Sequence, residues 1–186
     1  MTELTRDGRV HAMHEAGHEC LKKGDRQGAL EHFSKALELL ADDRALEMRA
    51  RLLNNMGHVQ VALRRFDEAL GSFEEAVRIY RRLGELIGLG EQLGNVGSVL
   101  RDKGEYDAAL KSYKDALAAF RESNQRIGIA DQHSNIGYIY AMKEDPDRAL
   151  EWFEMAHALY QEAGEHAKAQ SVAKNIEILK PSGVSR

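Results

Sequence analysis

The chain has 186 residues, of which 43% are hydrophobic and 30% are charged, and only two are prolines. This composition excludes a disordered chain and favours helices. A net charge of −4 argues against a protein that binds nucleic acid or anionic membranes through a basic surface.

A sequence pattern recurs every 40 residues. The segments NNMGHV, GNVGSV and SNIGYI place Asn55, Asn95 and Asn135 in one column, which Asn175 continues. The small and aromatic columns are Gly57, Gly97 and Gly137; Ala29, Ala69, Ala109 and Ala149; and Phe33, Phe73, Tyr113 and Phe153. Because these columns hold over several copies, we interpret the chain as an array of structural repeats.

Each repeat is expected to contain two helices, because its apolar residues fall on one helical face. In chain order the helices are expected at 9–23, 25–41, 44–63, 67–84, 86–103, 107–123, 126–143, 147–163 and 166–179. The last has no partner after it and is expected to cap the array. The expected organisation is one array over 9–179, with repeats at 9–41, 44–84, 86–123 and 126–163 and flexible ends at 1–8 and 180–186.

Local signals indicate how the second helix of each repeat begins and packs. Asp67, Asp107 and Asp147 precede the Ala-Leu pairs, where a short carboxylate is expected to cap free backbone N–H groups. Pro146 suits the first position of a helix, because no amide donor is lost there. The small columns are expected where two helix backbones approach closely and an aromatic ring inserts beside them.

The spacing of the second helix resembles that of the tetratricopeptide repeat family, whose second helix carries an A-x₃-F-x₂-A series. Ala69, Phe73 and Ala76 give one example. The period is 40 instead of the usual 34, and versions of that length with Asn-x-Gly in the first helix resemble the repeats of the Leu-Gly-Asn/Pins spindle adaptors. The resemblance implies an all-α, right-handed α-solenoid of four helix pairs with a C-terminal capping helix.

The resemblance also implies a concave groove lined by the first helix of each pair, in which a peptide or partner segment binds. The residues implied to face it are Arg51, Asn54, Asn55 and His58; Asn95, Ser98 and Arg101; Asp131, Ser134, Asn135 and Tyr138; and Asn175. The relatives of this length hold an extended peptide by its backbone through the Asn column.

Physical chemistry supports that use of the Asn column. An Asn amide offers both a donor and an acceptor, so it matches a peptide group whatever the side chain. Asn is also a poor helix former, so its recurrence in mid-helix asks for a reason. The alternative is that these amides bond to a neighbouring helix and only stiffen the stack. Repeat 1 carries Glu15 in this column, so the series would begin at Asn55.

A second motif, His14-Glu15-Ala16-Gly17-His18, fits the H-E-x-x-H pattern of zinc hydrolases. Gly17 lies in the Gly column, however, and helix packing explains it without a metal. A catalytic zinc site needs a third protein ligand, and no ligand motif follows in the sequence.

Adventitious metal binding is a milder alternative. His11, His14 and His18 form one stripe along a helix, and His58 occupies the position equivalent to His18 on the next first helix. A solvated histidine patch explains the same pattern, as does a patch that becomes cationic below about pH 6.5. We therefore expect no metal and no cofactor.

The sequence thus predicts a non-catalytic scaffold that binds a protein or peptide partner, with no nucleic acid or membrane partner. The single cysteine, Cys20, excludes an internal disulfide, and no apolar run resembles a signal peptide or reaches membrane-spanning length, so we expect a cytoplasmic protein. The alternatives are a module that self-assembles end to end, a sensor that relays peptide binding, and the zinc hydrolase. The mixed charges of the expected groove favour neither an acidic nor a basic ligand.

Overall fold

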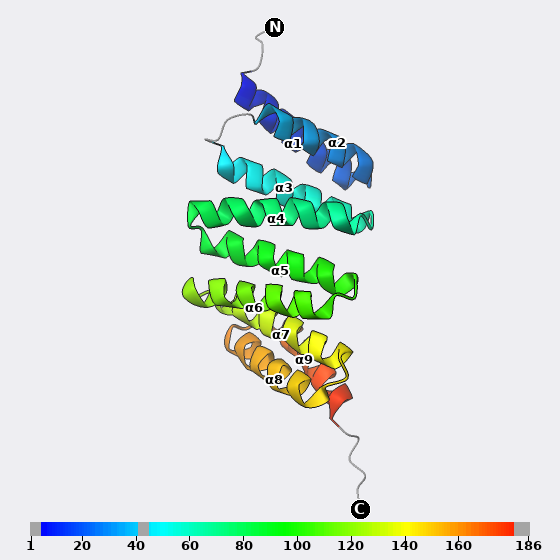
Figure 1. Ribbon diagram of the computed structural model, residues 1–186, viewed down its shortest axis with the longest axis vertical. Coiled ribbons are helices and arrows are strands. Elements are labelled where there is room, and N and C mark those ends of the chain that lie inside the picture. Colours follow the sequence, from blue (N-terminus) through cyan, green and yellow to red (C-terminus); the bar gives the residue numbers. More distant parts are fainter. Residues whose placement is uncertain (1–4, 41–44, 181–186) are drawn as a thin grey trace, which may run out of the picture. The chain divides into compact units, whose positions relative to one another are not determined.

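The computed structural model describes residues 5–40 and 45–180, and all regular secondary structure in these ranges is helical (Figure 1). The helices are α1 (Arg6–Lys22), α2 (Arg26–Leu39), α3 (Leu46–Ala62), α4 (Phe66–Leu83), α5 (Leu86–Asp102), α6 (Tyr106–Glu122), α7 (Arg126–Met142), α8 (Pro146–Glu162) and α9 (His166–Leu179). This order confirms the expected all-α fold class of four helix pairs and a final helix. None of the described helices is both long and apolar enough to cross a membrane.

The chain divides into two compact units, Met1–Gln92 and Leu93–Arg186. The first unit holds α1 to α4 and the start of α5, and the second holds the remainder of α5 and α6 to α9. That the repeats form one array over 9–179 stays a prediction. The first helix begins at Arg6, so residues 6–8 of the expected flexible end at 1–8 are helical. Residues 1–4 of that end, and residues 181–186 of the expected flexible end at 180–186, lie outside the described residues.

From Arg64 to Gly164, the described turns between helices repeat every 20 residues, and the turn at Gly24 has the same construction. Each contains one residue in the left-handed region, a glycine at Gly24, Gly84, Gly104 and Gly164 and another residue at Arg64, Asn124 and Glu144. The amide after it donates to a carbonyl five residues back, as from Glu105 N to Leu100 O at 2.9 Å. This is the Schellman ending of a helix, which satisfies free carbonyls and stops the helix. Each 40-residue repeat therefore contains two helices that end in the same way.

Glycines of the first helices face aromatic rings of the second helices, as predicted. A β-carbon placed on Gly57 would lie 2.5 Å from Cε1 of Phe73, and one on Gly97 would lie 2.6 Å from Cε1 of Tyr113. The same arrangement occurs at Gly17 and Phe33 and at Gly137 and Phe153. Since these rings are almost completely buried, each glycine provides the space in which its partner ring packs.

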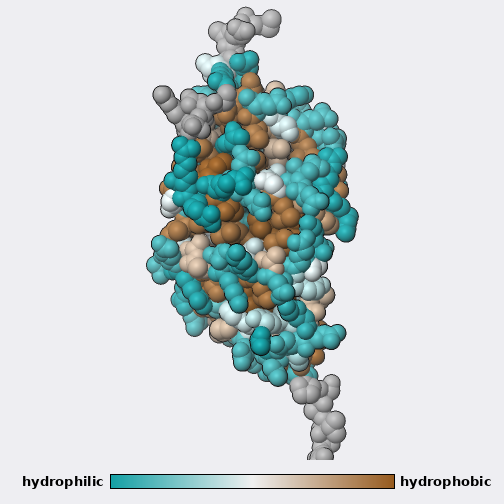
Figure 2. Space-filling view, viewed as in Figure 1, coloured by the Kyte–Doolittle hydropathy of each residue, from teal (hydrophilic) through white to brown (hydrophobic). Residues whose placement is uncertain are grey.

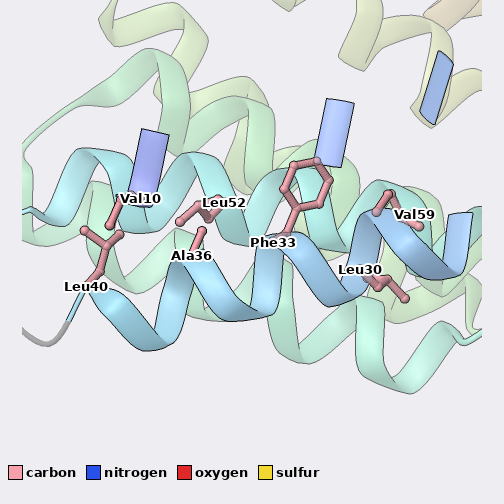
Figure 3. Close-up of a cluster of buried hydrophobic side chains, with 8 residues drawn as sticks. Val10, Leu30, Phe33, Ala36, Leu40, Leu52 and Val59 are labelled. Carbon is pink, nitrogen blue, oxygen red and sulfur yellow. The ribbon is translucent and has the colours of Figure 1, made fainter. Parts of the chain in front are cut away.

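Figure 3 shows how one such ring joins a wider core in the first unit. Phe33 of α2 lies among apolar side chains from three helices, including Val10 of α1 and Leu52 of α3. Phe33 and Leu52 have no exposed surface. Close packing of this kind fixes the angle between paired helices and hence the placement of their remaining side chains.

The predicted caps of the second helices were wrong by two residues. The residues at the N-caps are Arg65, Glu105 and Asp145, so the three expected caps lie inside the first turn. There their carboxylates complement the positive end of the helix dipole. Asp145 makes the cap of α8 by accepting from the backbone N–H of Arg148, and Pro146 is the first residue of that helix, as expected.

Candidate functional site

In the second unit, side chains of α5, α7 and α9 meet directly. The guanidinium of Arg101 on α5 lies 5.6 Å from the ring centre of Tyr138 on α7. Asp131 of α7 accepts from Nζ of Lys168 on α9 at 2.7 Å. The first helices of successive pairs are therefore neighbours in this unit, and the groove residues that the sequence assigned from Asn95 onward lie along them.

Two members of the Asn column have no hydrogen-bond partner among the described residues. The side chains of Asn135 on α7 and Asn175 on α9 are half-buried, and neither has a hydrogen bond within the described parts of the chain. Asn95 of α5 is also half-buried but does have an interaction partner. The amides of Asn135 and Asn175 thus retain both a donor and an acceptor for a ligand.

Aromatic and apolar surface accompanies these amides. Tyr138 follows Asn135 by three residues and is 45% exposed, while Ile178 follows Asn175 by three residues and is 80% exposed. Ser134 is half-buried beside Asn135. The space-filling view shows hydrophobic residues among a mostly hydrophilic surface on the face that it displays (Figure 2).

Ser98 and Asp131, which were also expected to contact the ligand, have internal partners. The hydroxyl of Ser98 donates to the carbonyl of Gly94 at 3.0 Å and accepts from Tyr113 Oη at 3.2 Å. Asp131 accepts from Tyr160 Oη at 2.5 Å as well as from Lys168. Burial, followed by this hydrogen bond, raises the pKa of Tyr160. These contacts connect neighbouring helices, a role that the sequence pattern did not reveal.

The first unit contains a polar pocket of about 280 Å³ formed by α1, α3, α4 and α5. It is lined by His14, His18, Arg51, Asn54, Asn55, Tyr80, Glu91 and Gln92. His14 is only 9% exposed. Burial, followed by repulsion from His18, lowers the pKa of the His14 imidazole. Burial raises the pKa of Glu91, and repulsion from the nearby Glu85 raises it further.

Three polar atoms meet in this pocket. Nε2 of His14 and Nε2 of His18 lie 3.1 Å apart, and Nδ2 of Asn55 lies 3.1 Å from the first and 3.3 Å from the second. Asn55 is therefore engaged by the H-E-x-x-H segment, unlike Asn135 and Asn175. The sequence carried a signal for this contact, because the two histidines occupy the columns that flank the Asn column, but we did not predict it.

The structure brings together two of the four imidazoles considered as metal ligands. His58 instead packs its ring against Phe73, with ring centres 5.3 Å apart. Over residues 5–40 and 45–180, no three His, Cys, Asp or Glu side chains are arranged to hold a metal ion. The zinc hydrolase alternative through His14-Glu15-His18 therefore finds no third ligand of these types among the described residues.

The sequence comparisons point to one family. The model of the tetratricopeptide repeat matches residues 48–122 and, in an overlapping register, residues 91–162. No curated protein sequence matches the chain.

Solved structures resemble the chain closely in fold. The apo form of RapI gives a TM-score of 0.88 at 18% identity, over 95% of this chain and 49% of that one. Aspartyl phosphate phosphatase F from Bacillus subtilis gives 0.83 at 18% identity, over 96% and 46%. BtubC from P. vanneervenii gives 0.68 at 16% identity, over 96% and 92%. The chain thus spans about half the length of the first two, and the likeness is one of fold.

Proposed function

Because the chain belongs to the tetratricopeptide repeat family, whose stacked helix pairs form extended binding surfaces, we propose that it is a non-catalytic scaffold that binds an extended peptide segment of a partner protein. The proposed contact surface lies in the second unit, on α5, α7 and α9. Its central residues are Asn135 and Asn175, with Asn95 as a further member of the same column.

The observation that carries this proposal is the pair of unpartnered amides at Asn135 and Asn175. A mid-helix Asn lowers helix stability relative to Ala, and these two recover none of that loss through a hydrogen bond to another described residue. An amide can donate to a peptide carbonyl and accept from a peptide N–H at once. Such a pair of contacts recognises the backbone of a ligand irrespective of its sequence.

The spacing of packed helices suits an extended ligand. Neighbouring helices pack about 8–10 Å apart, and an extended chain advances about 3.3 Å per residue. Successive Asn side chains would therefore meet every third peptide group of the ligand. The intervening ligand side chains point alternately toward and away from the protein.

Two charged side chains on these helices are paired within the protein. Arg101 forms an ion pair with Asp102 at 2.8 Å, and Asp131 is paired with Lys168. The exposed rings and aliphatic groups at Tyr138 and Ile178 remain for side-chain contacts. We therefore expect the ligand to be selected by its backbone and its apolar side chains more than by its net charge.

The name of one similar structure refers to a phosphatase, but that activity is not part of this proposal. The similarity is of fold at 18% identity, and the chain covers 46% of that protein. Fold alone does not determine activity.

Replacing both Asn135 and Asn175 with Ala should weaken peptide binding at least about tenfold, because each change removes hydrogen bonds worth about 1 kcal/mol net. The ligand would be a peptide selected from a random-sequence library against the wild-type chain, with affinity measured by fluorescence anisotropy. Gln161→Ala removes an exposed amide from α8 and serves as the matched control. Equal affinity for the wild type and the double variant, or no selectable peptide, would contradict the proposal.

A further inference from the structure

The contact among His14, His18 and Asn55 places three polar atoms within hydrogen-bond distance of one another. The three nitrogen atoms form a nearly equilateral triangle with sides of 3.1, 3.1 and 3.3 Å. Two of its atoms come from one face of α1 and the third from α3. The triangle opens on the polar pocket of the first unit.

Hydrogen bonds alone do not satisfy this triangle. If Asn55 donates to both imidazoles, the two Nε2 atoms face each other as lone pairs at 3.1 Å. If one Nε2 carries a proton and donates to the other, that N–H faces a donor of Asn55. When the imidazoles are neutral, two acceptors or two donors therefore always face each other along one side of the triangle.

A cation resolves the conflict if the Asn55 amide is turned so that its oxygen faces the histidines. The orientation of an amide is assigned from its hydrogen bonds, because nitrogen and oxygen are almost equivalent in shape. With the oxygen in that position, all three corners of the triangle carry a lone pair.

The size of the triangle matches metal coordination. Metal–imidazole nitrogen distances are about 2.0–2.1 Å, and a point at that distance from all three corners exists just outside their plane. From that point the two imidazole nitrogens, 3.1 Å apart, subtend an angle of about 100°. This angle lies between those of octahedral and tetrahedral coordination.

We propose that His14, His18 and the amide oxygen of Asn55 bind one late first-row divalent metal ion, such as Zn²⁺ or Ni²⁺. Imidazole nitrogen is a preferred ligand for these ions. Water would occupy the remaining coordination positions.

The surroundings of the triangle have opposing effects on a bound cation. Arg51 lines the same pocket and repels it, while Glu91 lines the pocket too, and Glu15 lies next to His14 in the sequence. The proposed site shares no residue with the peptide surface on Asn135 and Asn175.

Titration of the untagged, chelator-treated chain with ZnCl₂ or NiCl₂ alone tests this proposal by calorimetry at pH 7.5. We expect one equivalent to bind, with affinity reduced at least tenfold by His18→Gln and by His14→Gln. Asn55→Asp should preserve or strengthen binding, because a carboxylate oxygen replaces the amide oxygen. The bound ion should raise the thermal midpoint of the wild type but not that of His18→Gln.

His11→Gln and His58→Gln are the matched controls, because each removes an imidazole that lies outside the triangle. Both should bind the metal as the wild type does. The half-buried His18 is the decisive position if circular dichroism shows that replacement of the buried His14 disturbs folding. Absence of binding at 1 mM metal, or equal losses in His18→Gln and in the controls, would overturn the proposal.

Discussion

Gly57→Ala is expected to lower the free energy of unfolding by about 2 kcal/mol, at the middle of the range for overpacked cores. The added β-carbon would lie 2.5 Å from Cε1 and 2.6 Å from Cζ of Phe73, closer than real contacts allow. Phe73 is completely buried, so neighbouring side chains prevent its ring from moving away. Helices α3 and α4 would therefore have to separate. Urea denaturation followed by circular dichroism measures the change.

Gly71→Ala is the matched control. Gly71 lies in the interior of α4, and a β-carbon there would meet nothing within 4 Å. Because Ala loses less backbone entropy on folding, this change should stabilise the chain by about 0.5–1 kcal/mol. Phe73→Leu should relieve the crowding, so the double variant with Gly57→Ala should lose less than the sum of the single losses. Equal effects of the two glycine changes would contradict this packing.

Acid should destabilise the chain through His133 by about 3 kcal/mol between pH 6.5 and pH 4, since one unit of pKa difference is worth about 1.4 kcal/mol. Burial, followed by repulsion from Arg121, lowers the pKa of His133 to about 4. The side chain is 5% exposed and packs against Trp152 of α8. The unfolded chain takes up the proton first as the pH falls, so stability is complete above the unfolded pKa and declines toward the folded one.

His133→Met tests this linkage, because a neutral side chain of similar size removes the titration. Urea denaturation at intervals from pH 7 to pH 4 would give the unfolding free energy of the wild type and of the variant. Subtracting one from the other cancels the contribution of the carboxylates, because both proteins contain them. As the pH falls from 6.5 to 4, the wild type should lose more unfolding free energy than the variant. His166→Gln, at an exposed position, should leave the profile unchanged. Parallel profiles for His133→Met and the wild type would contradict the expectation.

The sequence was sufficient to predict the helix pairs and the contacts inside them. Periodicity identifies the buried face of each helix, and a glycine aligned with an aromatic residue in every repeat predicts a ring packed against a bare backbone, as at Gly97 and Tyr113. These contacts depend on residues that recur at a fixed distance along the chain, so comparison of the repeats reveals them.

Contacts between successive repeats were harder to predict, because they join side chains that do not recur. Asp131 meets Tyr160 and Lys168 through a combination that occurs in no other repeat, so the columns gave no sign of it. Members of the Asn column likewise differ in the side chains that they contact on the neighbouring helix. Asn55 meets the two histidines of the preceding helix, whereas Asn135 has no such partner. A column predicts where a side chain lies, and the adjacent helix determines what remains for it to bind.

The most direct measurement of the proposed function is an N-methyl scan of a peptide selected against the wild-type chain. Methylation of one backbone amide at a time removes a donor while leaving the side chains unchanged. We expect binding to fall at least about tenfold at peptide groups spaced about three residues apart, and Asn135→Ala to abolish the effect at one of them. Uniform tolerance of N-methylation, with affinity governed only by the peptide's side chains, would contradict backbone recognition by the Asn column.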